Sequence, residues 1–162
     1  IELVSHYVRL MNMRRKEKAR LILDIPEEAL TERVPRFFLQ PVIENALIHG
    51  LKHGEGTIRV GVRPERNRLV ISVEDDGAGM DDVFLQKLKA AIHSADGTGA
   101  KEIEPRRGFS GIGLSNVYER MCIIYGKSFS MEIASEINRG TTVTFIIPRM
   151  EVLEGHVQSH VG

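Results

Sequence analysis

Three short segments of the sequence contain residues that could bind a nucleotide together with its metal ion. The first surrounds Asn45, in an apolar-rich stretch expected to form a helix from Phe37 to Gly50, with Pro35 opening it. Residues four apart share one face of a helix, so Asn45 is expected on a polar-leaning stripe opposite the core-facing side chains. The other members of the stripe are Pro41, His49 and approximately Lys52. The core-facing side would consist of Leu39, Val42, Ile43, Ala46 and Leu47.

The amide of Asn45 is suited to a magnesium site. Mg²⁺ prefers oxygen ligands, keeps several water molecules and takes further ligands from phosphate groups. His49 and Lys52 would then add hydrogen-bond donors to those phosphates. Taken alone, the segment also fits a solvated helix face that carries an asparagine.

The second segment is Asp75-Asp76-Gly77-Ala78-Gly79, which directly follows an apolar strand. A carboxylate at the end of a strand can accept a hydrogen bond from the amino group of adenine. The two glycines would let a flat base approach the backbone and would allow the positive φ angles of a turn. Taken alone, the pentapeptide also fits an ordinary acidic turn.

The third segment, from Gly108 to Leu114, is rich in glycine and precedes a helix expected to start at about Leu114. Backbone N–H groups at such a helix start, together with the helix dipole, favour a phosphate group. The segment is not a Walker loop, because no Gly-Lys-Ser/Thr follows. It is not a dinucleotide fingerprint either, because no strand leads directly into it.

The spacing of apolar residues predicts the elements that must position these segments. Helices are expected at about 1–18, 37–50, 81–93 and 114–125, and strands at about 21–25, 57–62, 69–73, 129–134 and 141–147. A long loop is expected at 94–110 and a frayed tail from 150 onward. Strand pairs alternating with helices predict an α/β (α+β) two-layer sandwich, with one mixed, mostly antiparallel sheet and helices packed on one face.

Composition limits the classes of function. The 162 residues suffice for one domain, and 22 basic residues balance 22 acidic ones, which gives little reason to expect a nucleic-acid partner. The lone Cys122 excludes an internal disulfide. No apolar run approaches the ~18 residues that would span a bilayer. The chain begins at Ile1 rather than Met and is therefore expected to be a fragment, with membrane contact only through upstream segments.

The order of the three segments resembles the GHKL ATPase superfamily, which includes gyrase, heat-shock chaperones, mismatch-repair proteins and histidine kinases. The stretch LQPVIENALIHG at 39–50 looks like the N box of the LytS/YesM-like sensor histidine kinases. Residues 75–79 and 111–121 look like the two glycine boxes, and RGTTV at 139–143 completes the pattern. The resemblance covers roughly residues 1–149 and implies the Bergerat ATP-binding fold.

The resemblance implies a role in binding Mg-ATP for each matching residue. Asn45 would hold Mg²⁺ and serve catalysis, Asp75 would read the adenine amine, and Thr141 would support Asp75 through a hydroxyl or a water. A mobile ATP lid would lie at about 81–110. The residues implied to bind ATP are Asn45, His49, Gly50, Lys52, Asp75, Gly77, Gly79, Met80, Gly111, Ile112, Gly113, Leu114 and Thr141. Asp76 departs from the asparagine that many members have there.

Three functions remain open: a histidine kinase, a self-contained GHKL ATPase or anti-sigma-type serine kinase, and a non-catalytic nucleotide sensor. The ATPase and serine kinase branches use a Glu four residues before the magnesium Asn as general base. Here that position is Pro41, and Glu44 would lie ~100° away around the helix. A neutral histidine acceptor is already nucleophilic, so a histidine kinase needs no such base.

The favoured function is therefore the C-terminal ATP-binding catalytic domain of a two-component sensor histidine kinase. Residues 1–18 would be a helical remnant of the dimerisation region, 19–149 the ATP-binding domain and 150–162 a flexible tail. None of the six histidines fits the acceptor motif, so the phosphate acceptor is expected in an upstream domain. The expected protein partners are that domain and the receiver domain of a response regulator. The full-length protein would be a homodimer anchored in the bacterial cell membrane, with this domain in the cytoplasm.

Overall fold

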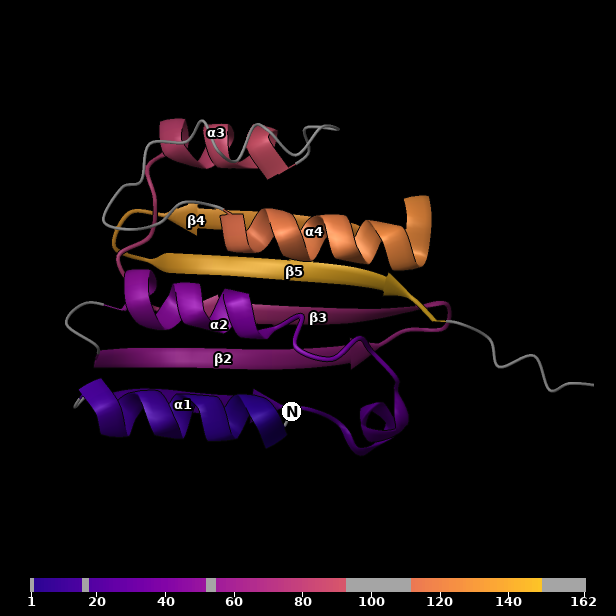
Figure 1. Cartoon of the computed structure of the whole chain (residues 1–162), viewed down its shortest axis with the longest axis horizontal. Coiled ribbons are helices and arrows are strands. Elements are labelled where there is room, and N and C mark those ends of the chain that lie inside the picture. Colours follow the sequence, from indigo (N-terminus) through magenta and orange to yellow (C-terminus); the bar gives the residue numbers. More distant parts are fainter. Residues whose placement is uncertain (1, 16–17, 52–54, 93–111, 150–162) are drawn as a thin grey trace, which may run out of the picture.

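The computed structural model describes residues 2–15, 18–51, 55–92 and 112–149, which form a five-stranded sheet with helices packed against it (Figure 1). The strands are β1 (Lys18–Asp24), β2 (Glu55–Pro64), β3 (Arg68–Asp75), β4 (Ser130–Glu136) and β5 (Gly140–Pro148). Their order in the sheet is β1-β2-β3-β5-β4. β1 and β2 are parallel, and the other neighbouring pairs are antiparallel. The predicted mixed, mostly antiparallel sheet is confirmed, with strand bounds that differ by a few residues.

Alternation along the strands explains which face of the sheet is covered. In β3, Leu69, Ile71 and Val73 are buried, while the side chains between them are only half-buried. The matching buried rows are Met131 and Ile133 in β4, and Val143, Phe145 and Ile147 in β5. Successive side chains of a strand point to opposite faces of a sheet. These rows therefore share one face, which the helices cover.

The helices lie mainly on that face. In the described part of the chain they are α1 (Glu2–Arg15), η1 (Glu27–Thr31), α2 (Gln40–Asn45), η2 (Ala46–Gly50), α3 (Asp82–Ile92), α4 (Ile112–Tyr125) and η4 (Gly126–Ser128). Figure 1 shows α1, α2 and α4 in front of the sheet, running along its strands. α3 packs beside β4 and α4. The predicted helices near 81–93 and 114–125 are confirmed.

The predicted helix from Phe37 to Gly50 starts later than expected. Phe37 has a φ angle of +65°, a left-handed conformation that a right-handed helix does not contain. The helix begins at Gln40, with Pro41 in its first turn, where a missing N–H costs nothing. The prediction that Pro35 opens this helix is therefore wrong.

The last turn of the same helix is wider than predicted. After Asn45 the chain continues as the π-helical turn η2, which is followed by a Leu51 N–H that donates to the Ala46 carbonyl at 2.8 Å. The four-residue spacing used to align Asn45 with His49 holds for an α-helix and does not describe this turn. Single π-helical turns are frequent at functional sites.

The core between sheet and helices uses the predicted apolar side of this segment. All of its predicted core residues are buried: Leu39, Val42, Ile43, Ala46 and Leu47. Phe38 adds an edge-on contact to Phe145, with ring centroids 5.2 Å apart and ring planes at 85°. This packing fixes α2 on the sheet and sets the direction in which its other side faces.

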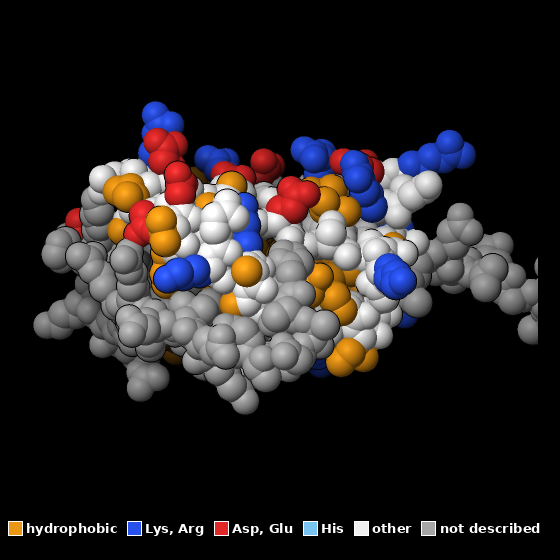
Figure 2. All heavy atoms as spheres, turned by 90° about the horizontal axis from the view of Figure 1, so that it is seen from above, with side chains coloured by type: hydrophobic (Ala, Val, Ile, Leu, Met, Phe, Trp, Pro, Cys, Tyr) orange, Lys and Arg blue, Asp and Glu red, His pale blue; other side chains and the backbone are white. Residues whose placement is uncertain are grey.

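Acidic and basic side chains are intermixed along one side of the molecule in the view of Figure 2. This mixture agrees with the equal numbers of basic and acidic residues in the chain. Among the described helices, none combines the length and apolar character that crossing a membrane requires.

Candidate functional site

Three elements meet at one end of the sheet, at the left of Figure 1: β3 and η2 end there and β5 begins there. This end of the two central strands is called the β3–β5 edge. Asp75 is the last residue of β3, and it pairs in register with Thr141 near the start of β5. η2 ends at Gly50, where an added Cβ atom would lie 2.8 Å from Asp75 Oδ1. A side chain at Gly50 would therefore collide with the carboxylate. The structure thus brings Gly50, Asp75 and Thr141 together.

The loop that follows Asp75 is held by backbone hydrogen bonds from both sides. The Gly77 N–H donates to Asp75 Oδ1 at 3.0 Å, and the Ala78 N–H donates to the Gly50 carbonyl at 2.7 Å. From the β4–β5 turn, the Asn138 N–H donates to the Ala78 carbonyl at 2.7 Å. A Cβ atom on Gly77 would lie 2.0 Å from the Gly50 carbonyl oxygen, so the two backbones are in direct contact. This corner leaves room only for glycine.

Both the backbone conformation and the neighbouring atoms require glycine at position 79. Gly79 has a φ angle of +62°, and an added Cβ atom would lie 1.9 Å from the Glu136 carbonyl oxygen. Gly126 offers a matched comparison, because its φ angle is +61° but a Cβ atom there would meet nothing within 4 Å.

We expect Gly79→Ala to lower the free energy of unfolding by about 2–4 kcal/mol, which combines left-handed strain with overpacking. Gly126→Ala should cost only the strain, about 1 kcal/mol. Urea denaturation of both variants measures the difference. Equal losses would show that the Gly79–Glu136 approach does not constrain the loop.

Asp75 has an unusual protonation equilibrium for a carboxylic acid. Burial raises its pKa from 3.8 to about 6, and the nearby charge of Asp76 adds to the rise. The backbone amides of Gly77 and Thr141 favour the charged form and act in the opposite direction. A carboxyl group with a pKa perturbed by burial in a glycine-lined corner is typical of a ligand site.

Asp76 turns away from this corner. Its exposed carboxylate accepts a hydrogen bond from the Thr57 N–H at 2.7 Å, and its own N–H donates to the Thr57 carbonyl at 3.3 Å. These contacts extend the β2–β3 pairing by one step beyond Asp75. An asparagine oxygen could accept the same hydrogen bond, so the charge of Asp76 is not needed for this contact.

Asn45 ends α2 with an unsatisfied polar group. Its side-chain Nδ2 is buried and has no hydrogen-bond partner among the described residues. Buried polar groups are usually paired, and an unpaired one costs free energy that a bound ligand can recover. The neighbouring Glu44 is engaged elsewhere, because Gln40 Nε2 donates to Glu44 Oε1 at 2.9 Å.

The amide of Asn45 fits a magnesium ion held mainly by phosphates and water. The described residues contain no group of three or more His, Cys, Asp or Glu side chains that could hold a metal ion. A site of the kind that Mg²⁺ prefers needs only one or two protein oxygens when a phosphorylated ligand supplies the rest. Asn45 Oδ1 is an oxygen of the kind that such a site uses, and the unpaired Nδ2 beside it is a donor that a phosphate oxygen or a metal-bound water could satisfy.

Gly113 brings α4 close to α2. An ideal Cβ atom on Gly113 would lie 3.4 Å from Pro41 Cβ, which is van der Waals contact. Pro41 and Asn45 are four residues apart on α2 and share a face. Asn45 therefore lies on the side of α2 that faces the first turn of α4. Leu114, which the sequence assigns to the phosphate loop, is buried.

Not every predicted site residue can be placed. Lys52 and Gly111 lie outside the described residues, as does the predicted loop at 94–110. His49 lies in η2, and Ile112 is the first residue of α4. Four of the predicted residues, Gly50, Asp75, Gly77 and Thr141, contact one another at the β3–β5 edge. Gly79 and Met80 contact β4 beside it, through Glu136 and Ser135.

Ser135 also lies at this edge and is not among the residues predicted from the sequence. Its hydroxyl contacts Thr141 Oγ1 at 2.9 Å and accepts a hydrogen bond from the Met80 N–H at 2.9 Å. Nothing in the spacing of the motifs points to Ser135, because its position depends on the register between β4 and β5.

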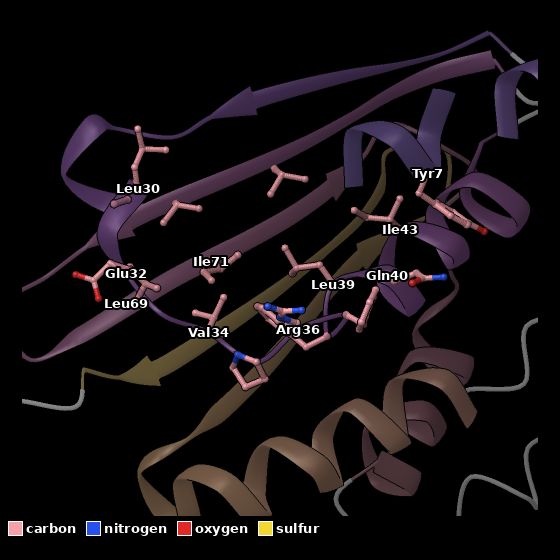
Figure 3. A pocket seen from close by; sticks show the side chains of 16 residues that line it. Tyr7, Leu30, Glu32, Val34, Arg36, Leu39, Gln40, Ile43, Leu69 and Ile71 are labelled. Atoms are coloured by element: carbon pink, nitrogen blue, oxygen red, sulfur yellow. The ribbon is translucent and has the colours of Figure 1, made fainter. Parts of the chain in front are cut away.

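A separate pocket of about 510 Å³ lies toward the β2–β3 turn (Figure 3). Figure 3 shows Tyr7 of α1, Ile43 of α2 and Ile71 of β3 among its lining side chains. Arg149, at the end of the described chain, pairs with the pocket residue Glu32 at 2.5 Å. None of the predicted site residues lines this pocket.

Comparison with known proteins identifies the family. The family described as histidine kinase-, DNA gyrase B- and HSP90-like ATPase matches residues 35–151. The chain is 31% identical over 155 residues to the sensor histidine kinase YesM of Bacillus subtilis (strain 168). It is 32% identical over 149 residues to the sensor protein LytS of Bacillus anthracis. These matches cover 94% and 90% of the chain but 24% and 23% of the relatives, so the chain spans about a quarter of their length.

Solved structures agree on the fold. The catalytic domain of the histidine kinase ThkA superimposes with a TM-score of 0.64 at 17% sequence identity, covering 92% of each chain. The blue-light activated histidine kinase of Erythrobacter litoralis EL346 gives a TM-score of 0.56, covering 90% of this chain and 40% of the other. The chain therefore belongs to the family of histidine kinase-, DNA gyrase B- and HSP90-like ATPases, as a catalytic domain of the kind found in sensor histidine kinases.

Proposed function

We propose that this domain binds Mg-ATP at the β3–β5 edge and donates the γ-phosphate to a histidine in a separate, upstream domain. The adenine would lie against the loop from Asp75 to Met80, and the phosphates would lie toward the first turn of α4. Membership of the ATPase family supports the nucleotide, and the sensor kinase relatives support the histidine acceptor.

The observation that carries the proposal is the corner formed by Gly50, Asp75 and Gly77. A half-buried carboxylate there is surrounded by backbone that approaches too closely for any side chain. Because Gly50 and Gly77 carry no side chain that would cover the carboxylate, a flat base can reach Asp75, whose ionised form accepts hydrogen bonds only. The amino group of adenine is a donor, whereas guanine presents an oxygen at the same position. The corner thus favours adenine over guanine.

Asn45 would hold the metal that neutralises the phosphates. Its amide oxygen would be the ligand, and a partner for its buried Nδ2 would come from the bound nucleotide or its water. When bound, Mg²⁺ would supply charge neutralisation on the transferred phosphate. The protein's own contribution is to orient the nucleotide, since phosphoryl transfer depends mainly on positioning and electrostatics.

Pro41 and Glu44 support transfer to histidine rather than hydrolysis of ATP. Pro41 occupies the position on the Asn45 face from which a general base would act, and it has no group that accepts a proton. The Glu44 carboxylate accepts a hydrogen bond from Gln40 instead. A neutral imidazole needs no base to attack phosphorus, so its transfer can proceed without one. A self-contained ATPase or serine kinase fits this arrangement less well.

Two measurements test the proposed function. Calorimetry should give a dissociation constant for Mg-ATP between about 1 μM and 1 mM, that is, roughly −8 to −4 kcal/mol. Incubation with γ-labelled ATP should label the histidine-bearing domain of the same protein when that domain is added in trans, and should not label this chain alone. Binding without transfer would indicate a nucleotide sensor, and steady release of phosphate without an acceptor would indicate an ATPase.

The affinity for Mg-ATP is expected to fall as the pH drops below about 6, because Asp75 becomes protonated at its raised pKa of about 6. The phosphates of ATP titrate nearby, so Asp76→Asn serves as the control. Removing the Asp76 charge lowers the pKa of Asp75 and should shift the midpoint of the affinity profile to lower pH. Titration calorimetry between pH 5 and 8 measures both profiles. Coincident profiles would show that Asp75 does not govern the dependence.

For the full-length protein, we propose a membrane-anchored homodimer that signals through a response regulator. In that assembly the γ-phosphate would pass from this domain to the upstream histidine and then to the receiver domain. A cytoplasmic location would place the site in contact with ATP. The lid is proposed to lie at about 81–110, residues that include α3.

A further inference from the structure

The hydroxyl of Ser135 joins the Asp75–Met80 loop to the beginning of β5. The Met80 N–H donates to Ser135 Oγ at 2.9 Å, across 55 positions of sequence. Ser135 Oγ also donates to the Gly140 carbonyl at 2.9 Å and contacts Thr141 Oγ1 at 2.9 Å. Ser135 thus connects the far end of the loop to two residues of β5.

These contacts use the full hydrogen-bonding capacity of the serine. A hydroxyl has one donor and two acceptor positions. When Ser135 donates its proton to the Gly140 carbonyl, the Thr141 hydroxyl must be the donor in the contact between the two side chains. The remaining acceptor position takes the Met80 N–H. The geometry therefore assigns the direction of each hydrogen bond around this group.

The strand register places Ser135 in one row with Asp75, the carboxylate proposed to bind the amino group of adenine. Thr141 pairs with Asp75 on one side and with Ser135 on the other. Residues directly opposite one another in a sheet point to the same face. Asp75, Thr141 and Ser135 therefore form a lateral row across three strands, on the same face as the buried Val73, Val143 and Ile133.

The rest of the loop is held by contacts that do not involve Ser135. Ala78 is fixed through its backbone to Gly50 and Asn138, and Gly79 lies against the Glu136 carbonyl. Met80 follows directly, and its amide is fixed by a side chain. A substitution at Ser135 can therefore change the shape of the loop without changing the backbone contacts of Gly50.

We propose that Ser135 is a positioning residue for adenine recognition: it holds the Asp75–Met80 loop in the shape that receives the base. This inference rests on the proposed function, because it concerns the same nucleotide site. Ser135 itself would not contact the nucleotide. It acts through the Met80 amide and through Thr141.

The test compares Ser135→Ala with Ser135→Thr, and with Ser130→Ala as a matched control in an exposed position at the far end of β4. Ser135→Ala is expected to weaken binding of Mg-ATP about tenfold, because the Met80 N–H loses its acceptor. The preference for ATP over GTP should decrease as well. Ser135→Thr retains the hydroxyl and should restore both, and Ser130→Ala should leave both unchanged.

Calorimetry with Mg-ATP and Mg-GTP separates the outcomes. If the unaltered chain neither binds ATP nor prefers it to GTP, the proposed function and this inference both fail. If the unaltered chain binds ATP and prefers it to GTP, and Ser135→Ala keeps the same affinity and the same preference, only the positioning role of Ser135 is wrong. A loss that Ser135→Thr does not restore would also contradict it.

A measurement without substitution covers the case in which Ser135→Ala does not fold. In the unaltered chain, the amide of Met80 should exchange its hydrogen with solvent as slowly as the amide of Ala78, which donates to the Gly50 carbonyl. Exchange of the Met80 amide at the rate of an unprotected amide would contradict the contact with Ser135 and overturn the proposal.

Discussion

Replacing Asn45 with alanine is expected to abolish phosphotransfer to the histidine-bearing domain while leaving the fold intact. The amide is the proposed protein ligand of Mg²⁺, and alanine has no oxygen to replace it. The buried Nδ2 of Asn45 has no partner among the described residues, so removing it does not break a hydrogen bond of the fold. Alanine also favours a helix more than asparagine does. The free energy of unfolding should therefore stay the same or rise by up to about 1 kcal/mol.

Transfer of label from γ-labelled ATP to the added acceptor domain measures the activity, and urea denaturation measures the stability. Asn67→Ala, an exposed change in the β2–β3 turn, provides the control and should retain full transfer. If Asn45→Ala unfolds the domain, Asn45 supports the core rather than a ligand. If Asn45→Ala transfers phosphate as fast as the unaltered domain, Asn45 is not the ligand of Mg²⁺.

Replacing Asp75 with asparagine is expected to weaken binding of Mg-ATP by about 1.5–3 kcal/mol, or roughly ten- to 150-fold. The asparagine loses the negative charge and can present an N–H₂ group toward the adenine amine, so donor would face donor. The free energy of unfolding of the nucleotide-free domain should not fall by a comparable amount. Because its pKa is raised to about 6, ionised Asp75 is less favourable in the folded domain than in the unfolded chain.

A raised carboxyl pKa contributes stability that is fully present below 3.8 and is lost as the pH rises through about 6. Asparagine does not ionise, so Asp75→Asn should match or exceed the stability of the unaltered domain at pH 8. Asp24→Asn, at the exposed end of β1, is the control and should leave ATP affinity unchanged. An unchanged ATP affinity in Asp75→Asn would show that this carboxylate does not read the base.

The fold could be predicted largely because its elements have clear periodicity. The alternation of apolar residues in β2 predicted a strand, and the apolar side of α2 predicted the residues that face the core. The backbone at the ends of α2 could not be predicted in this way. The left-handed conformation of Phe37 and the π turn after Asn45 depend on how α2 packs against the sheet, and neither has a local sequence signal.

The sequence identified residues that meet at the β3–β5 edge. It did not show the close contacts that require glycine at positions 50 and 77. Gly50 and Gly77 appeared as a helix end and part of a turn, whereas the structure shows that each lies against Asp75 or the other's backbone. Ser135 was missed because β4 carries no motif and its contact with Met80 arises from strand register. Contacts between residues distant in sequence require the assembled sheet.

In the proposed complex, α2, the β3–β5 edge and the start of α4 surround one magnesium-bound adenine nucleotide. Titration of the chain with Mg-ATP, followed by the backbone amide signals in NMR, tests it most directly. We expect the signals of one set of amides to shift together with a single dissociation constant: Asn45, Gly50, Asp75, Gly77, Gly79 and Gly113. Shifts confined to the separate pocket around Leu30 and Phe37, or no shifts at millimolar Mg-ATP, would contradict it.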